Sequence, residues 1–311
     1  MAIQTSRPTS ILILHNPGSR RGVEARRFLE EKLSQKHPHL NLQWCQVLDT
    51  PGTPECPDRV IVMGGDGTIR LAMNWLSTHD IKVPVGLIPA GTGNNLAQGL
   101  GIPLDFESSS NLAIEGLGVQ SIDTLQVSFD GRSMGKMLQI FSTGLPAIIT
   151  HRFEKWRKTP LVSIPVRYSG DYFYRFLAIQ ALLTDRKRRF PSTIEIENER
   201  FSSTGPAIFV GNEATIGGGF KPCPQALLDD GLLDICILPE ISYFDAFHLF
   251  NKVSTGEHLD THSNVVYRQA RKIKLTQEPL PVLIDGDIAG SPEIVDIEVN
   301  PGDLSLISSK F

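Results

Sequence analysis

Residues 59–68, RVIVMGGDGT, join an apolar run directly to a glycine-rich turn. The apolar run has the length and the β-branched content of a strand, and the glycines that follow it indicate a turn. The same order recurs at residues 84–95, PVGLIPAGTGNN, and at residues 10–22, SILILHNPGSRRG. A helical pattern follows each turn, so the chain is predicted to contain repeated strand–loop–helix units. Such units build a parallel sheet with helices on both faces.

The sequence pattern changes near Ser121. Downstream, short β-rich runs alternate with Gly, Pro or charged turns, which is typical of an antiparallel sandwich or barrel. A chain of 311 residues is long enough for about two domains. We therefore predict an α/β domain over residues 1–123 and a β-rich, sandwich-like domain over residues 124–311, with the last residues returning to the first domain.

The composition is that of a folded, soluble protein. The chain is 41% hydrophobic and 21% charged, and its net charge of −4 provides no global basic field for nucleic acid. Its four cysteines lack CxxC spacing, which favours reduced thiols. The N-terminus has no signal-peptide profile, and the longest uncharged run, residues 83–104, contains three prolines. We expect a cytoplasmic protein without a membrane span.

The turn at residues 64–68 has the composition of an anion-binding loop. Glycines let the backbone approach an anion closely, and a helix N-terminus favours phosphate. Thr68 is expected to cap that helix. A carboxylate repels phosphate, so Asp66 indicates a Mg²⁺ ion between the two. A tight structural turn, with Asp66 as a turn residue, is the alternative.

The three glycine-containing loops are predicted to meet at one edge of the sheet. The carboxyl ends of parallel strands share an edge, and open α/β sheets bind ligands there. Arg20 and Arg21 in the first loop are available to phosphate. The sequence contains no GxxxxGK[ST], no GxGxxG in the first strand–helix turn and no GxSxG, which disfavours a P-loop protein, a dinucleotide-binding Rossmann domain and a serine hydrolase.

Six motifs together resemble the diacylglycerol kinase catalytic-domain family, which includes bacterial soluble lipid kinases, sphingosine kinases and ceramide kinases. They are NPGS at residues 16–19, GGDGT at 64–68, PAGTGNN at 89–95, GGGFKP at 217–222, DDGLLD at 229–234 and DGD at 285–287. The GGDGT motif alone is shared with NAD kinases. The resemblance implies ATP- and Mg²⁺-dependent transfer of phosphate to a lipid hydroxyl.

The resemblance also implies roles for individual residues, with ATP bound between the domains. The residues implied for ATP are Asn16, Pro17, Gly18, Ser19, Arg20, Thr50, Gly65, Asp66, Gly67, Thr68, Thr92 and Asn94. For catalysis it implies Asp287 as the general base on the lipid hydroxyl, with Asp285 and Asp66 beside it. For a structural Mg²⁺ it implies the side chain of Asp230 and the backbone carbonyls of Leu227 and Leu232.

Three positions depart from the family pattern. Asn95 and Leu71 stand where acidic residues are common, and Asp287 is one CH₂ shorter than the usual Glu. Two alternatives therefore stay open. One is a kinase of a soluble acceptor such as NAD, for which residues 211–214, GNEA, are the nearest match to the acidic loop of NAD kinases. The other is a non-catalytic, ATP-binding regulator.

Two basic runs, residues 152–158 and 186–190, bear on the partners. They suit contact with anionic lipid head groups, at about 1 kcal/mol per cation near such a surface, or equally a solvated helix face and hairpin tip. The expected partners are a lipid substrate and no nucleic acid. The sequence leaves open a peripheral contact with the inner membrane surface and a homodimer.

Overall fold

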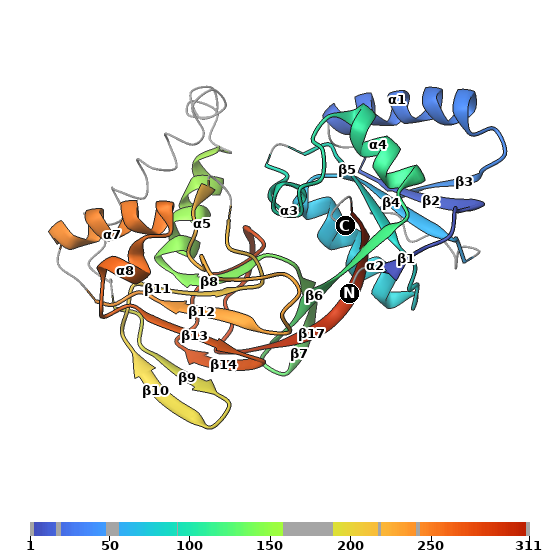
Figure 1. Cartoon of the computed structure of the whole chain (residues 1–311). Helices are drawn as coiled ribbons and strands as arrows, with labels where there is room; N and C mark the ends of the chain where they lie inside the picture. Colours follow the sequence, from blue (N-terminus) through green and yellow to red (C-terminus); the bar gives the residue numbers. More distant parts are fainter. Residues whose placement is uncertain are drawn as a thin grey trace. The chain divides into compact units, whose positions relative to one another are not determined.

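The computed structural model describes residues 3–16, 20–47, 56–91, 93–157, 189–216, 219–240 and 243–308 (Figure 1). The chain divides into two compact units. The first unit comprises Met1–Thr124 and Asn300–Phe311, and the second comprises Leu125–Val299. The chain passes between the units twice, within β6 (Gly118–Phe129) and within β17 (Ile294–Ile307).

Four parallel strands form the sheet of the first unit, in the order β3–β2–β4–β5. They are β2 (Ser10–His15), β3 (Asn41–Gln46), β4 (Arg59–Gly64) and β5 (Val85–Pro89). Every residue of β4 and β5 is buried, as expected for strands covered on both faces. Leu306 of β17 pairs in parallel with Val85, so the end of the chain extends the sheet beyond β5. The short β1 (Ile3–Gln4) pairs antiparallel with the start of β6.

Helices cover both faces of this sheet, which confirms the predicted α/β fold. They are α1 (Arg20–Lys36), α2 (Asp66–Thr78), α3 (Asn95–Gly99) and α4 (Phe106–Glu115). Helices α1 and α4 lie over one face, where Leu29 and Ala113 share a buried cluster with Ile61. Helix α2 lies over the opposite face (Figure 1). Among the described residues, no helix is both long and apolar enough to cross a membrane.

The second unit is an antiparallel β-sandwich, which confirms the predicted class of the C-terminal part. One sheet runs β10–β9–β14–β17 with β6 and β7 beside it, and the other runs β13–β12–β11–β8–β15–β16. The strands not yet given are β7 (Arg132–Met137), β8 (Ile140–Gly144), β9 (Ser192–Ile196), β10 (Glu199–Ser203), β11 (Ala207–Gly211), β12 (Leu233–Ile237), β13 (Val266–Ala270), β14 (Lys272–Gln277), β15 (Val282–Ile284) and β16 (Asp287–Gly290).

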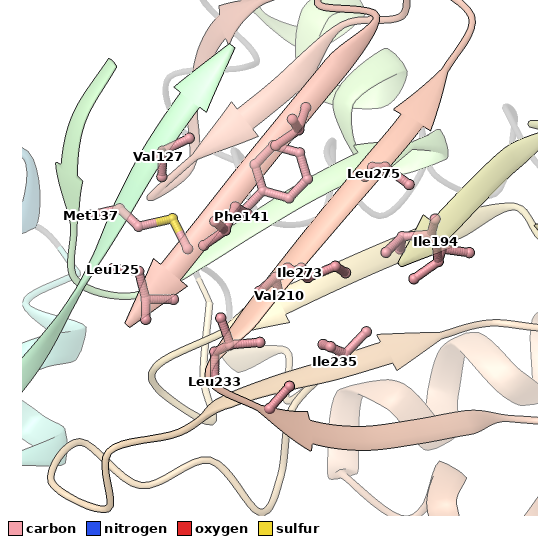
Figure 2. Packing of buried hydrophobic residues seen from close by; sticks show 14 of the residues in the cluster. Leu125, Val127, Met137, Phe141, Ile194, Val210, Leu233, Ile235, Ile273 and Leu275 are labelled. Carbon is pink, nitrogen blue, oxygen red and sulfur yellow. The ribbon is translucent and has the colours of Figure 1, made fainter. Parts of the chain in front are cut away.

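One hydrophobic core holds the two sheets of the sandwich together (Figure 2). Ile194 and Ile273 project into it from one sheet, and Phe141, Val210 and Ile235 project into it from the other. All of these side chains are buried. Alternation along each strand places the remaining side chains on the outer faces.

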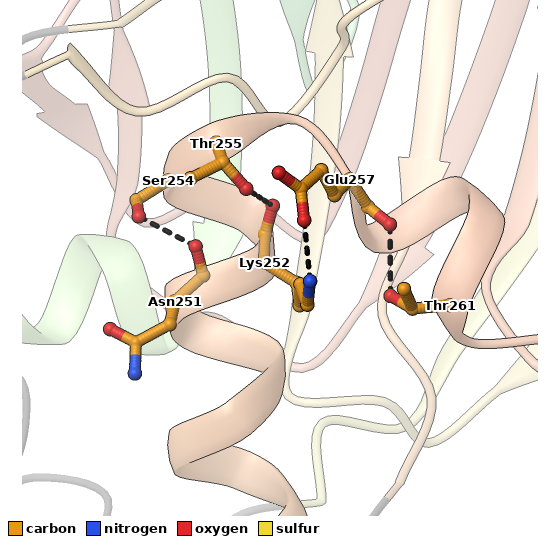
Figure 3. A network of polar contacts seen from close by, with 6 residues as sticks. All are labelled: Asn251, Lys252, Ser254, Thr255, Glu257 and Thr261. Atoms are coloured by element: carbon orange, nitrogen blue, oxygen red, sulfur yellow. Dashed lines mark hydrogen bonds and ion pairs between the residues drawn. The ribbon is translucent and has the colours of Figure 1, made fainter.

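Three helices accompany the sandwich: α5 (Leu145–Arg157), α7 (Tyr243–Thr255) and α8 (His258–Thr261). The turn between α7 and α8 is closed by polar contacts (Figure 3). Lys252 forms an ion pair with Glu257, and Thr261 Oγ1 donates to Glu257 O at 2.8 Å. Lys221 N donates to Val253 O at 3.0 Å, so the last part of α7 also anchors the chain at Lys221.

Asp58 fastens the start of β4 to the start of β2. Its Oδ2 accepts hydrogen bonds from Thr9 Oγ1 at 2.6 Å, from Thr9 N at 2.7 Å and from Ser10 N at 3.0 Å. These donors, with the Thr9 hydroxyl foremost, lower the pKa of Asp58 to about 2. The ionised carboxylate therefore stabilises the folded state above about pH 4. This stabilisation is lost as the pH falls toward 2.

We expect Asp58→Asn to destabilise the protein at pH 7, because the amide replaces a charged acceptor by a neutral one. The loss is on the order of 0.5–1 kcal/mol, since the carboxylate is exposed and solvent screens it. Thermal unfolding of the two proteins at several pH values measures the effect. The difference in Tm should narrow as the pH falls below about 4, and a difference that is constant with pH would contradict the assignment.

Candidate active site

The loops after β4 and β5 touch backbone to backbone. A Cβ atom added to Gly91 would lie 2.4 Å from the Cα of Gly65, and one added to Gly65 would lie 2.9 Å from the Cα of Gly91. Ala90 N also donates to Gly64 O at 2.9 Å. Both positions must therefore be glycine, because real Cβ atoms are not found at such distances from backbone atoms. The two glycine-rich motifs thus form one continuous structure at the carboxyl edge of the sheet.

Asp66 joins the loop after β4 to the loop after β5. It is the first residue of α2, and its carboxylate accepts hydrogen bonds from Asn95 N and Leu96 N, both at 3.1 Å. The carboxylate therefore caps the start of α3 across the two loops. An ionised carboxylate has about four acceptor positions, so these two bonds leave capacity for a cation. The catalytic role implied for Asp66 stays a prediction.

Asn94 stabilises the loop after β5 by hydrogen bonds within that loop. Its backbone is left-handed, with φ 52°, and its side chain is buried. Gly91 N donates to Asn94 Oδ1 at 2.9 Å, and Asn94 Nδ2 donates to Gly91 O at 3.1 Å. Arg21 of α1 also donates to Gly91 O, at 3.1 Å, so α1 is joined to the carbonyl that Asn94 contacts. Sequence reasoning had assigned Arg21 to phosphate and had not indicated this contact.

Thr68 does not cap α2, contrary to the sequence-based expectation. The helix begins two residues earlier, with Gly65 as its N-cap and no side-chain capping bond. Thr68 is buried instead beneath Gly64, where an added Cβ would lie 2.4 Å from the Thr68 Cβ. Gly67 is exposed and faces open space. Gly67 is therefore the exposed residue of this turn, and the ATP contact implied for Thr68 stays a prediction.

The remaining residues implied for ATP are placed only in part. Asn16 directly follows β2, and Arg20 begins α1. The others, Pro17, Gly18, Ser19, Thr50 and Thr92, lie outside the described residues. Of the basic run 186–190, Arg189 and Phe190 are described: Arg189 pairs with Glu240 at 2.6 Å, and Phe190 is buried.

In the second unit, the DGD motif forms a tight hairpin between β15 and β16. Ile284 pairs with Asp287, and the two turn residues, Asp285 and Gly286, have φ values of 50° and 87°. Asp-Gly is the preferred sequence for such a turn. The Asp285 carboxylate accepts hydrogen bonds from Leu138 N at 3.1 Å and from Gln139 N at 2.8 Å. Asp287 is exposed at the first position of β16. The Asp285 carboxylate therefore holds the turn in place, and Asp287 is the more exposed acid of the motif. The catalytic roles implied for both stay predictions.

Leu138 and Gln139 also form hydrogen bonds with the two residues that follow β11, Asn212 and Glu213. Asn212 N donates to Gln139 O at 2.8 Å, and Asn212 Nδ2 donates to Leu138 O at 3.1 Å. Gln139 Nε2 donates to the buried Glu213 carboxylate at 3.0 Å. The segment Leu138–Gln139 therefore joins the GNEA and DGD motifs. Sequence reasoning did not predict this junction, because the segment carries no motif of its own.

The DDGLLD motif forms a turn that leads into β12. Asp230 Oδ1 accepts a hydrogen bond from Leu232 N at 2.9 Å, and Gly231 has φ 74°. Leu227, which precedes this turn, is exposed. In the part of the chain that the structure describes, no three His, Cys, Asp or Glu side chains form a metal-binding group. The Mg²⁺ ligand set implied here, one carboxylate and two carbonyls, stays a prediction.

Comparison with known proteins links both units to kinases. Residues 10–127 match the model of the diacylglycerol kinase catalytic domain. Residues 142–308, more than half of the chain, match the model described as the YegS C-terminal NAD kinase beta sandwich-like domain.

Individual relatives agree with these models. A Staphylococcus aureus (strain Newman) protein, named as an unconfirmed lipid kinase, is 25% identical over 283 residues, which are 91% of this chain and 87% of that protein. A Bacillus anthracis structure, titled an unconfirmed diacylglycerol kinase, aligns with a TM-score of 0.74 at 19% identity and covers 98% of this chain and 97% of its own. Yeast NADH kinase aligns with a TM-score of 0.53 at 11% identity and covers 98% of this chain and 85% of its own. The two structural likenesses show the fold alone.

We expect Gly91→Ala to lower the free energy of unfolding by about 2 kcal/mol, because its Cβ would meet backbone that cannot move aside. This corresponds to a fall in Tm of about 5 °C for a chain of this size. Gly67→Ala is the matched control: its Cβ meets nothing within 4 Å, and alanine favours a helix over glycine. Differential scanning calorimetry should therefore show an unchanged or higher Tm for the control, and equal shifts for both variants would refute the glycine contact.

Proposed function

The chain belongs to the diacylglycerol kinase catalytic-domain family, and on this premise we propose that it is an ATP-dependent lipid kinase that transfers the γ-phosphate of ATP to a lipid hydroxyl. The observation that carries the proposal is the joined pair of glycine-rich loops at the ends of β4 and β5. The name of the staphylococcal relative supports a lipid as the acceptor. The product is a lipid phosphomonoester.

The first unit supplies groups suited to bind the phosphates of ATP. The first N–H groups of α2 have no partners within the helix, and the helix dipole favours an anion at this end. Gly67 lies in this first turn and faces open space, so a phosphate oxygen can approach its backbone. Asp66 keeps α3 aligned with α2 through its two hydrogen bonds. These contacts support nucleotide binding by the loops of this unit.

The second unit supplies the proposed base. Asp287 is exposed, and a carboxylate at this position can accept the proton of an attacking lipid hydroxyl. Asp285 fixes the turn that presents Asp287, through its bonds to the backbone of Leu138 and Gln139. The exposure of Asp287 and the hydrogen bonds of Asp285 support general-base catalysis by Asp287, with Asp285 as a positioning residue.

A Mg²⁺ ion, when bound, offsets negative charge and strengthens the loop that holds it. Asp230, with the backbone carbonyls of Leu227 and Leu232, would hold it in the DDGLLD loop. The donor set fits, because Mg²⁺ prefers carboxylate and carbonyl oxygens. A buried carboxylate oxygen of Asp234, in the same motif, also lacks a hydrogen-bond donor among the described residues, as expected where a cation belongs.

A transfer assay tests the proposal directly. Purified protein with γ-labelled ATP should phosphorylate a member of a panel of diacylglycerol, ceramide and sphingosine in mixed micelles. Label on NAD in place of the lipids would support the soluble-acceptor alternative. Binding of ATP without transfer to any acceptor would support the non-catalytic regulator, and both of these results would overturn the lipid-kinase proposal.

We expect Asp287→Asn to lower kcat at least 100-fold and to leave Tm nearly unchanged, because it removes an exposed base. Asp285→Ala should lower Tm by several degrees as well as kcat, because alanine is strained at positive φ and cannot bind the two N–H groups. The lipid assay and thermal unfolding, run on both variants, separate the roles. A normal kcat for Asp287→Asn would remove Asp287 from the mechanism.

A further inference from the structure

Gln139 lies where three neighbouring strands of one sheet have their ends. Strand β8 runs between β11 and β15 in the sheet that also carries the DGD hairpin. At this end of the sheet, Ile140 of β8 pairs with Gly211 of β11. On the other side, Phe141 of β8 pairs with Ile284 of β15. Because Gln139 directly precedes β8, it lies next to the ends of both neighbouring strands.

The backbone of Gln139 is hydrogen-bonded on both sides. Gln139 N donates to Asp285 Oδ1 at 2.8 Å, on the side of the DGD turn. Gln139 O accepts a hydrogen bond from Asn212 N at 2.8 Å, on the side of β11. Asp285 N in turn donates to Ile140 O at 3.0 Å. A displacement of Gln139 would therefore also displace the turn that precedes Asp287.

The side chain of Gln139 adds a third hydrogen bond. Gln139 Nε2 donates to Glu213 Oε2 at 3.0 Å, and the two side chains are only 3% and 5% exposed. A buried amide and a buried carboxyl group cost free energy when they lack a partner, so each favours the other's position. The contact therefore holds Gln139 where its N–H group meets the Asp285 carboxylate.

The burial of Glu213 separates it from the exposed acid of the site. An acid that binds a substrate must be reached by that substrate, as Asp287 can be on the surface. Glu213 is buried, and one of its carboxylate oxygens accepts a hydrogen bond from Gln139. The GNEA motif resembles the acidic loop of NAD kinases, but in this chain its acid is bonded within the protein. This geometry favours an internal role for Glu213 over contact with an acceptor.

We propose that Glu213 and Gln139 are positioning residues for the DGD turn. The Glu213 carboxylate holds the Gln139 amide, and Gln139 holds the Asp285 carboxylate, which fixes the turn that presents Asp287. The inference rests on the proposed function, in which Asp287 is the base. A misplacement of about 1 Å far from the reacting atoms can lower a rate on the order of 100-fold, so this chain of contacts matters for catalysis.

Gln139→Ala tests the role of the side chain, because it removes the bond to Glu213 and keeps both backbone bonds. We expect kcat for lipid phosphorylation to fall at least tenfold and the KM for ATP to stay unchanged. Gln277→Ala is the matched control in the same unit. Gln277 is also buried, at 6% exposed, and its Oε1 accepts a hydrogen bond from Thr143 Oγ1 at 2.8 Å.

The control separates positioning from general stability. Both alanine variants should lose a similar number of degrees in Tm, because each loses one buried side-chain hydrogen bond. Only Gln139→Ala should lose activity, and Gln277→Ala should keep kcat within about twofold of the wild type. Equal losses of kcat in the two variants, or a wild-type kcat in Gln139→Ala, would overturn the proposal.

An exchange of the two groups tests the contact itself. Gln139→Glu places two carboxyl groups against each other and should lower kcat further than Gln139→Ala does. Adding Glu213→Gln restores one amide and one carboxyl group with the bond reversed, so the double variant should regain most of the lost activity. Glu213→Gln alone keeps an acceptor for Gln139 and should change kcat and the acceptor KM less than about threefold. A failure of the rescue, or a tenfold higher acceptor KM in Glu213→Gln, would contradict the positioning role.

Hydrogen exchange distinguishes a failure of this inference from a failure of the proposed function. The Asp285 N–H group is bonded to Ile140 O, so its exchange reports the order of the turn. Exchange at this amide should be at least tenfold faster in Gln139→Ala than in the wild type or in Gln277→Ala. If the wild type transfers no phosphate, this difference still supports the contact, and only the proposed function is lost. Unchanged exchange in Gln139→Ala would overturn the positioning role, whatever the activity.

Discussion

Two strand-to-helix loops can touch backbone to backbone only where no side chain lies between them. Gly65 and Gly91 meet in this way, and the polar structure of the first unit follows from that contact. With the two backbones in touch, the Asp66 carboxylate reaches the N–H groups that open α3. Asn94 and Arg21 then converge on the peptide of Gly91. The helix N-terminus at α2 owes its fixed direction to this backbone packing.

The same physical device occurs in both units. Asp66 in the first unit and Asp285 in the second each accept hydrogen bonds from two consecutive backbone N–H groups. Each carboxylate thereby holds a distant loop in register with its own turn. The acidic motifs of this chain thus contain organising carboxylates as well as the exposed Asp287, which is the base that we propose. Exposure separates the two kinds, since Asp287 is exposed and Asp285 is partly buried.

Much of the fold could be predicted from the sequence, because strand periodicity and glycine-rich turns are local signals. The parallel first sheet and the antiparallel sandwich follow from them. Helix α4 has no strong apolar period, and the sequence did not indicate it.

The contacts of the site were harder to predict from the sequence, because they join residues that are far apart in the chain. The bond between Gln139 and Asp285 spans 146 positions, and Gln139 lies in no motif. Thr68 was misplaced because a typical capping residue three positions into a helix looks the same in sequence as one at its start.

The return of β17 to the first unit has a consequence for biosynthesis. Leu306 supplies the partner of β5, Gly302 N donates to Asp123, and Ser308 N donates to Gly118 O. The first unit is therefore translated early and completed last, after the whole sandwich has left the ribosome. Until then the outer edge of β5 lacks its native strand, and unpaired edges invite wrong pairings. The first unit is thus synthesised first and completed last. During that interval the edge of β5 must be kept from pairing with a wrong strand.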